Sequence, residues 1–144
     1  MFPDLGLDPQ SRPARGLRRY IGLIEETLGL SGQGSCVQLE RPLSAYVAIE
    51  GRVPAFPDRD VALLWDERYG WAVAVEARCG EDLLVLAYLG GPVVPSPRVV
   101  ARFVHRALDG EPAGAPEPDV LEAGDVHDEL AVYAPAGEEL LAAR

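Results

Sequence analysis

The sequence predicts an α+β fold, a two-layer sandwich in which two helices pack on a four-stranded antiparallel sheet. Three observations lead to this prediction. Apolar residues near the start of the chain recur with a helical period, four short apolar runs follow, and a second helical segment comes after them. The connections between the four runs are too short to hold a crossover helix, so neighbouring strands must run antiparallel.

The first helix is expected over about residues 13–28, after an N-terminal arm of residues 1–13 that contains three prolines. Its apolar residues follow the spacing i, i+3, i+4, i+7, i+11 and are Leu17, Tyr20, Ile21, Ile24 and Leu28. Gly29 followed by Leu30 is typical of a Schellman ending. The domain that begins with this helix is expected to span residues 14–110.

Four segments have the length and composition of strands, and together they predict a meander. They are residues 44–52, 60–66, 71–78 and 82–89. The second and third of these strands carry the two tryptophans of the chain, Trp65 and Trp71, around the turn sequence DERYG.

The register of this hairpin decides whether the two tryptophans share a face. If Asp66–Gly70 is a five-residue connection, Trp65 lies opposite Trp71 and both indoles point to one side of the sheet. If residues 67–70 form a four-residue loop, Trp65 lies opposite Ala72 and the indoles point apart. An aromatic pair of this kind either stabilises the sheet from inside or offers an exposed binding face.

The second helix is expected after Ser96, a good N-cap, with Pro97 at its first position and Gly110 beyond its end. Its predicted buried face consists of Val99, Val100, Phe103, Ala107 and Leu108. Arg98, Arg102 and Arg106 form a stripe on the same helix, which either is a solvated face or docks an anion, an acidic partner or the acidic end of the chain.

Residues 111–144 are expected to form an acidic tail rich in proline, glycine and alanine. They hold nine acidic residues against one arginine, whereas the net charge of the whole chain is −10. A short strand is expected at residues 130–134 and a short helix at residues 137–143, in a tail that is mobile or loosely docked.

The composition argues against nucleic acid as a partner, because nonspecific affinity for it comes from cationic side chains. The chain lacks an apolar run long enough to span a membrane and lacks the pattern of a signal peptide, so we expect a cytoplasmic protein without a membrane partner. Cys36 and Cys79 are then expected as reduced thiols, with a disulfide between them as the alternative.

The chemical motifs predict no catalytic, cofactor-binding or metal-binding residue. The segment GQGSC around Ser35 and Cys36 lacks the arrangement of a nucleophile elbow, and His105 and His127 belong to no metal-binding pattern. A further group of carboxylates clusters at predicted turns and consists of Asp58, Asp60, Asp66, Glu67, Glu81 and Asp82. Solvated strand ends usually carry such charges.

Two adjoining segments resemble a family of actinobacterial domains of unknown function, the one numbered sixty-two ninety-two. They are FPDRDVALLWDERYGWAVAVE and GEDLLVLAYLGGPVVPSPRVVARFV, and the resemblance covers roughly residues 16–107. It implies no activity and no site residues. The order of helix, antiparallel strands and helix is also similar to secretion-chaperone-like and YbjN-like domains, which bind other proteins and are typically dimeric.

The sequence therefore favours a small, non-catalytic protein-binding or adaptor module whose partner is another protein or a second copy of itself. Its candidate interaction surface consists of Trp65, Tyr69, Trp71, Arg98, Arg102 and Arg106. The alternative is a small-molecule-binding protein or an enzyme with a pocket near the turns around residues 36, 58–60 and 79–82.

Overall fold

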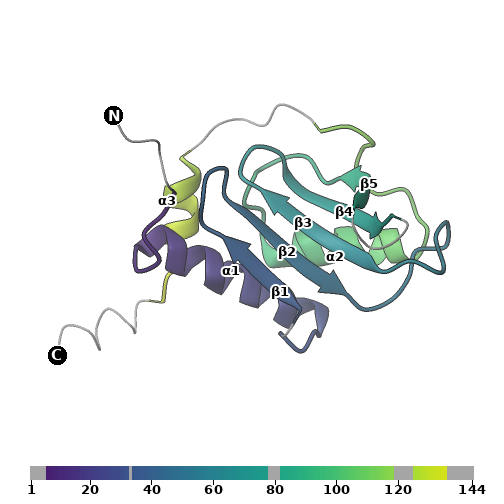
Figure 1. Ribbon diagram of the computed structural model, residues 1–144, viewed down its shortest axis with the longest axis horizontal. Helices are drawn as coiled ribbons and strands as arrows, with labels where there is room; N and C mark the ends of the chain where they lie inside the picture. Colours follow the sequence, from purple (N-terminus) through teal and green to yellow (C-terminus); the bar gives the residue numbers. More distant parts are fainter. Residues whose placement is uncertain (1–5, 33, 78–81, 119–124, 136–144) are drawn as a thin grey trace.

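The computed structural model describes residues 6–32, 34–77, 82–118 and 125–135 of the chain. Its elements in chain order are α1 (Arg12–Leu28), β1 (Ser35–Gln38), β2 (Ser44–Ile49), β3 (Val61–Asp66), β4 (Gly70–Glu76), β5 (Leu83–Tyr88), α2 (Pro97–Leu108) and α3 (Val126–Ala131). The predicted α+β class is confirmed. Figure 1 shows the sheet in one layer with α1 and α2 behind it, on the same face.

The sheet is an antiparallel meander with the strand order β1-β2-β3-β4-β5, so the prediction of four strands is wrong by one. The predicted strands correspond to β2, β3, β4 and β5, whereas the short edge strand β1 was not expected. Its sequence SCVQ has a single large apolar residue, Val37. The strand pairs only with β2, and every second side chain of it is exposed. Such a segment carries almost no strand signal of its own.

The ends of both long helices follow from local chemistry. The Ser11 side chain accepts the Ala14 amide at the start of α1, and the Leu30 amide donates to the Glu25 carbonyl at its end, as expected for a Schellman motif. Gly29 adopts a positive φ of 73°, which only glycine adopts without strain. The Ser96 side chain caps α2 by accepting the Val99 amide.

The buried face of α2 is rotated from the predicted one. The residues of this helix that lie in the core are Val100, Ala101, Phe103 and Val104, whereas Ala107 and Leu108 are half-buried. Val99 is 40% exposed, so its predicted place in the buried face is wrong. Val99 lies instead beside residues 112–114, where it lines a surface pocket.

The hairpin of β3 and β4 has the first of the two expected registers. Trp65 lies opposite Trp71 and Asp66 lies opposite Gly70, so the two indoles share one face of the sheet. Leu63 opposite Val73 and Val61 opposite Val75 continue the same apolar face toward the helices. This face forms the centre of the hydrophobic core.

The segment 125–135 contains a helix, and the strand expected at residues 130–134 is wrong. The Asp125 side chain accepts the amides of His127 and Asp128 and so starts α3, which ends at Ala131. Leu130 is fully buried against α1, where a Cβ on Gly16 would lie 1.8 Å from its carbonyl oxygen. This close approach holds α3 on the body of the protein. The helix expected at 137–143 lies outside the described residues.

Candidate functional site

The two tryptophans, expected in an interaction surface, lie instead in the core. Each is about 1% exposed, because their shared face of the sheet is the one that the helices cover. The Trp65 indole nitrogen donates to the Val93 carbonyl at 2.8 Å, and the Trp71 indole nitrogen donates to the Tyr20 hydroxyl at 3.0 Å. Both tryptophans are therefore part of the core, as the structural interpretation of the pair expects.

Tyr69 remains at the surface, in the turn between β3 and β4. The Arg68 guanidinium lies 4.9 Å from the centre of its ring, and the same guanidinium bonds both carboxylate oxygens of Asp66, at 2.9 and 3.0 Å. This bond and the charge of Asp66 raise the pKa of Arg68 above its ordinary value. Tyr69 and Arg68 thus form a small cluster with Asp66 at the surface, whereas the tryptophans are buried.

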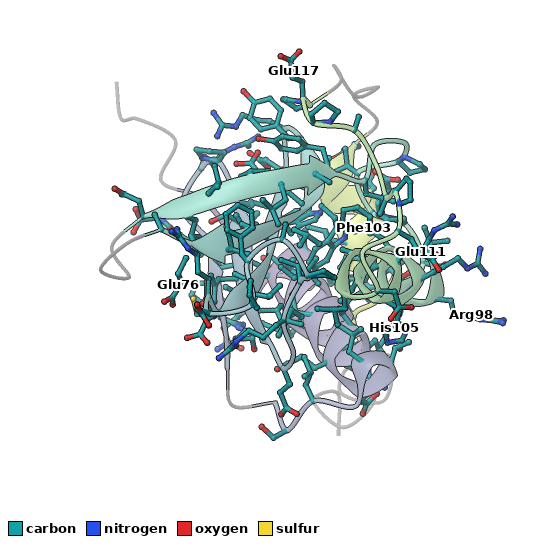
Figure 2. The ribbon with its side chains drawn as sticks, turned by 90° about the vertical axis from the view of Figure 1, so that its right-hand side faces the viewer. Glu76, Arg98, Phe103, His105, Glu111 and Glu117 are labelled. Atoms are coloured by element: carbon teal, nitrogen blue, oxygen red, sulfur yellow. The ribbon has the colours of Figure 1, made fainter. Side chains whose placement is uncertain are left out.

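The arginine stripe of α2 is exposed, and two of its members border a cavity. This surface pocket, named the α2 cavity, is open to solvent, has a volume of about 340 Å³ and is lined by Leu89, Val99, Arg102, Phe103, Arg106, Pro112, Ala113 and Gly114. The Arg106 guanidinium lies 3.7 Å from the Glu111 carboxylate. In Figure 2, Phe103 lies toward the sheet, whereas Arg98 points away from the molecule. The sequence placed the arginines correctly but gave no sign of the cavity.

A second surface feature is strand β5, at the edge of the sheet opposite β1 (Figure 1). All six of its residues, LLVLAY, are uncharged, and Leu83 and Leu84 are 39% and 45% exposed. The Tyr88 amide and carbonyl exchange hydrogen bonds with Ala115 at 2.7 and 2.9 Å, which covers that end of the edge. The strand was predicted, but its place at an edge depends on the sheet order.

The alternative site near the strand-end turns corresponds to a groove on the sheet face away from the helices. It has a volume of about 270 Å³, and its lining includes Cys36, Tyr46, Leu64 and Asp66. Burial, followed by the charges of Glu76 and Asp60, raises the pKa of the Tyr46 hydroxyl above its ordinary value. A raised pKa keeps this hydroxyl protonated near neutral pH and makes it a poor source of a phenolate nucleophile.

The turn carboxylates are mostly bound to arginines. Asp60 lies 2.8 Å from Arg52, and Glu67 lies 3.3 Å from Arg41. Glu81 and Cys79 lie outside the described residues, and Cys36 is a free, exposed cysteine. Within the described ranges, no three His, Cys, Asp or Glu side chains are grouped so that they could hold a metal ion.

The two histidines occupy different environments. His105 is exposed on α2, as expected. His127 on α3 faces the β3–β4 turn, with its Nε2 atom 3.9 Å from the Glu67 carboxylate. That nitrogen is buried and has no hydrogen-bond partner among the described residues. The docking of α3 creates this contact, which no local sequence pattern indicates.

None of the helices in the described segments is long and apolar enough to cross a membrane. Residues 20–106 match the family model of DUF6292, a family of unknown function, which confirms the resemblance expected from the sequence. The matched range runs from the middle of α1 to α2 and includes all five strands. No curated protein and no solved structure matches the chain. The similarity to secretion-chaperone-like and YbjN-like domains stays a prediction.

Proposed function

The chain belongs to the DUF6292 family, whose function is unknown, and we propose that it is a non-catalytic, cytoplasmic adaptor that pairs with a second copy of itself through β5. The observation that carries this proposal is that the outer edge of β5 is only partly covered within the described part of the chain. An edge strand offers unpaired amide and carbonyl groups, and proteins usually protect such an edge with charge, proline, a bulge or a cover.

The two halves of β5 differ in this protection. Ala115 covers Tyr88, and the register shift opposite Val73 and Ala74 leaves Leu86 as the extra residue of a bulge. Residues Leu83–Val85 have no charge, no proline and no strand neighbour on their outer side within the described part of the chain. The opposite edge, β1, is short and largely polar. The unprotected half of β5 is therefore the better surface for strand addition.

A second copy fits this edge better than a charged partner strand. Because the strand is uncharged, antiparallel pairing with itself places apolar side chains opposite apolar side chains in a two-fold arrangement. The exposed Asp82 precedes the strand, and antiparallel pairing puts the two copies of this carboxylate at opposite ends. Parallel pairing would bring the two charges together.

The proposal that the protein is non-catalytic is supported by the arginines that bind its turn carboxylates. The turn carboxylates of Asp60, Asp66 and Glu67 each face an arginine, so none of them is poised as a general base. The groove beside Tyr46 favours the alternative of a small-molecule site, and its polar lining consists of Cys36, Gln38, Ser44, Tyr46 and an Asp66 carboxylate bound by Arg68. Because Arg68 bonds both oxygens of the Asp66 carboxylate, this carboxylate is not free to act as a general base for the thiol or the hydroxyl group.

Light scattering coupled to size-exclusion chromatography tests the pairing. The native chain should elute at twice the monomer mass, and the double variant Leu83→Lys, Leu84→Lys should elute as a folded monomer, because lysine on an edge opposes strand addition. Val132→Lys is the matched control, since Val132 is 79% exposed and lies outside β5, and it should stay dimeric. A native chain that is monomeric at every concentration, or a dimeric double variant, would overturn the proposal.

A further inference from the structure

The α2 cavity combines apolar walls with a cationic rim. Val99, Arg102, Phe103 and Arg106 follow the spacing i, i+3, i+4, i+7, so one strip of α2 faces the cavity. Phe103 is buried, whereas both arginines are exposed. A volume of about 340 Å³ lies within the range of ligand-binding sites. The cavity can therefore accept an apolar group with a negative charge beside it.

The cations of this strip are only partly neutralised. Arg98 extends the arginine row by one helical turn, and neither Arg98 nor Arg102 has an ion-pair partner among the described residues. The chain as a whole carries a net charge of −10, whereas this row presents three arginines of which only Arg106 has an ion-pair partner among the described residues. Charge complementarity points to an anionic occupant.

Residues 111–113 of the chain contact the α2 cavity in the way expected of such an occupant. Glu111 places its carboxylate at the Arg106 guanidinium, and the next residues, Pro112 and Ala113, line the cavity wall. An acidic residue followed by apolar ones thus already lies along one side of the strip. A second segment of this kind would find Arg98 and Arg102 farther along the same row of arginines.

We propose that the α2 cavity binds an acidic peptide segment of a partner protein, with an apolar side chain in the cavity and carboxylates on Arg98 and Arg102. The inference rests on the proposed adaptor function, because it names the chemistry of the partner, but it uses a surface separate from the Leu83–Val85 edge. An adaptor of this kind would join two copies through β5 and hold one acidic segment on each.

Fluorescence anisotropy with a labelled synthetic peptide tests the proposal. The probe is a peptide with one leucine between two glutamates on each side, and its analogue has glutamine in place of every glutamate. The glutamate peptide should bind and should bind more weakly as salt is raised, because salt screens exposed charges. Arg102→Gln and Arg98→Gln should each weaken binding about fivefold, the equivalent of one exposed ion pair.

Arg68→Gln is the matched control, because it removes the same charge from an exposed arginine in the β3–β4 turn. It should leave peptide binding unchanged. The proposal is overturned if the glutamate peptide does not bind, if the glutamine analogue binds equally well, or if Arg102→Gln binds like the native chain. The Leu83→Lys, Leu84→Lys variant should keep peptide binding, so loss of the dimer and loss of the peptide site are separate results.

Discussion

The Trp71 indole on β4 donates a hydrogen bond to the Tyr20 hydroxyl on α1 at 3.0 Å, inside the core. The same hydroxyl donates to the carbonyl oxygen of Pro95, in the segment before α2. The Tyr20 ring also lies 4.8 Å from the ring of Tyr133, just after α3. The Tyr20 side chain of α1 thus contacts strand β4, the segment before α2 and the segment after α3.

Replacing Tyr20 with phenylalanine should destabilise the protein by about 2–4 kcal/mol, because the Trp71 indole and the Pro95 carbonyl would stay buried without partners. Urea unfolding measures this free energy. Tyr69→Phe is the matched control, since Tyr69 is exposed. It should change stability by less than about 0.5 kcal/mol. Equal stabilities of the two variants would contradict the hydrogen-bonding role of Tyr20.

The stability of the protein should fall at alkaline pH, because the Tyr20 hydroxyl is buried in its protonated form. Burial raises the pKa of Tyr20 above its ordinary value. The folded state then keeps the proton where the unfolded state loses it, so the contribution is complete below about pH 10 and is lost above it. Urea midpoints measured from about pH 8 to about pH 11 should decline, and the decline should be shallower in Tyr20→Phe. Tyr46, whose pKa burial also raises, should account for part of the remaining slope.

Both tryptophans should be shielded from solvent in the native protein. Acrylamide quenching of their fluorescence should be weak in the folded state and strong in urea, because Trp65 and Trp71 are buried and hydrogen-bonded. Single variants Trp65→Phe and Trp71→Phe separate the two signals. Efficient quenching of either indole in the folded protein would show that the hairpin presents it to solvent.

Two glycines of α1 should respond in opposite directions to alanine. Gly16→Ala should destabilise the protein by about 1–3 kcal/mol, because the added methyl group would collide with the Leu130 carbonyl and push α3 away. Gly22→Ala meets nothing within 4 Å and should stabilise by about 0.5–1 kcal/mol through helix propensity. Thermal or urea unfolding compares them. Similar shifts in both variants would mean that α3 does not pack at Gly16.

Gly114 should matter for the α2 cavity in particular. A Cβ there would lie 2.1 Å from the Tyr88 carbonyl oxygen and 3.0 Å from the Phe103 ring, so Gly114→Ala should displace the cavity wall and weaken binding of the glutamate peptide. Gly91→Ala is the control, because Gly91 has a similar positive φ and no neighbour within 4 Å. Gly91→Ala should lose about 1 kcal/mol of stability from backbone strain, and Gly114→Ala should lose more, because its clash with the Tyr88 carbonyl adds to the same strain. Peptide affinity unchanged by Gly114→Ala would contradict this arrangement.

The sequence by itself determined the features that depend on a few neighbouring residues. Ser96 and Pro97 start α2, and Gly29 ends α1, because capping is local chemistry. The short connections between apolar runs determined that the strands are antiparallel and follow one another in order. The exposure of the α2 arginines also followed from their helical spacing.

Only the tertiary structure decided what depends on distant partners. The sequence admitted two registers for Trp65 and Trp71, and the pairing within the folded sheet selects one of them. Strand β1 and helix α3 are too short to be recognised from their own sequences. Each depends on a distant partner, since β1 pairs with β2 and α3 packs closely against Gly16 of α1. The α2 cavity and the open edge of β5 are likewise products of packing. Surfaces made from segments far apart in the chain exist only once those segments meet.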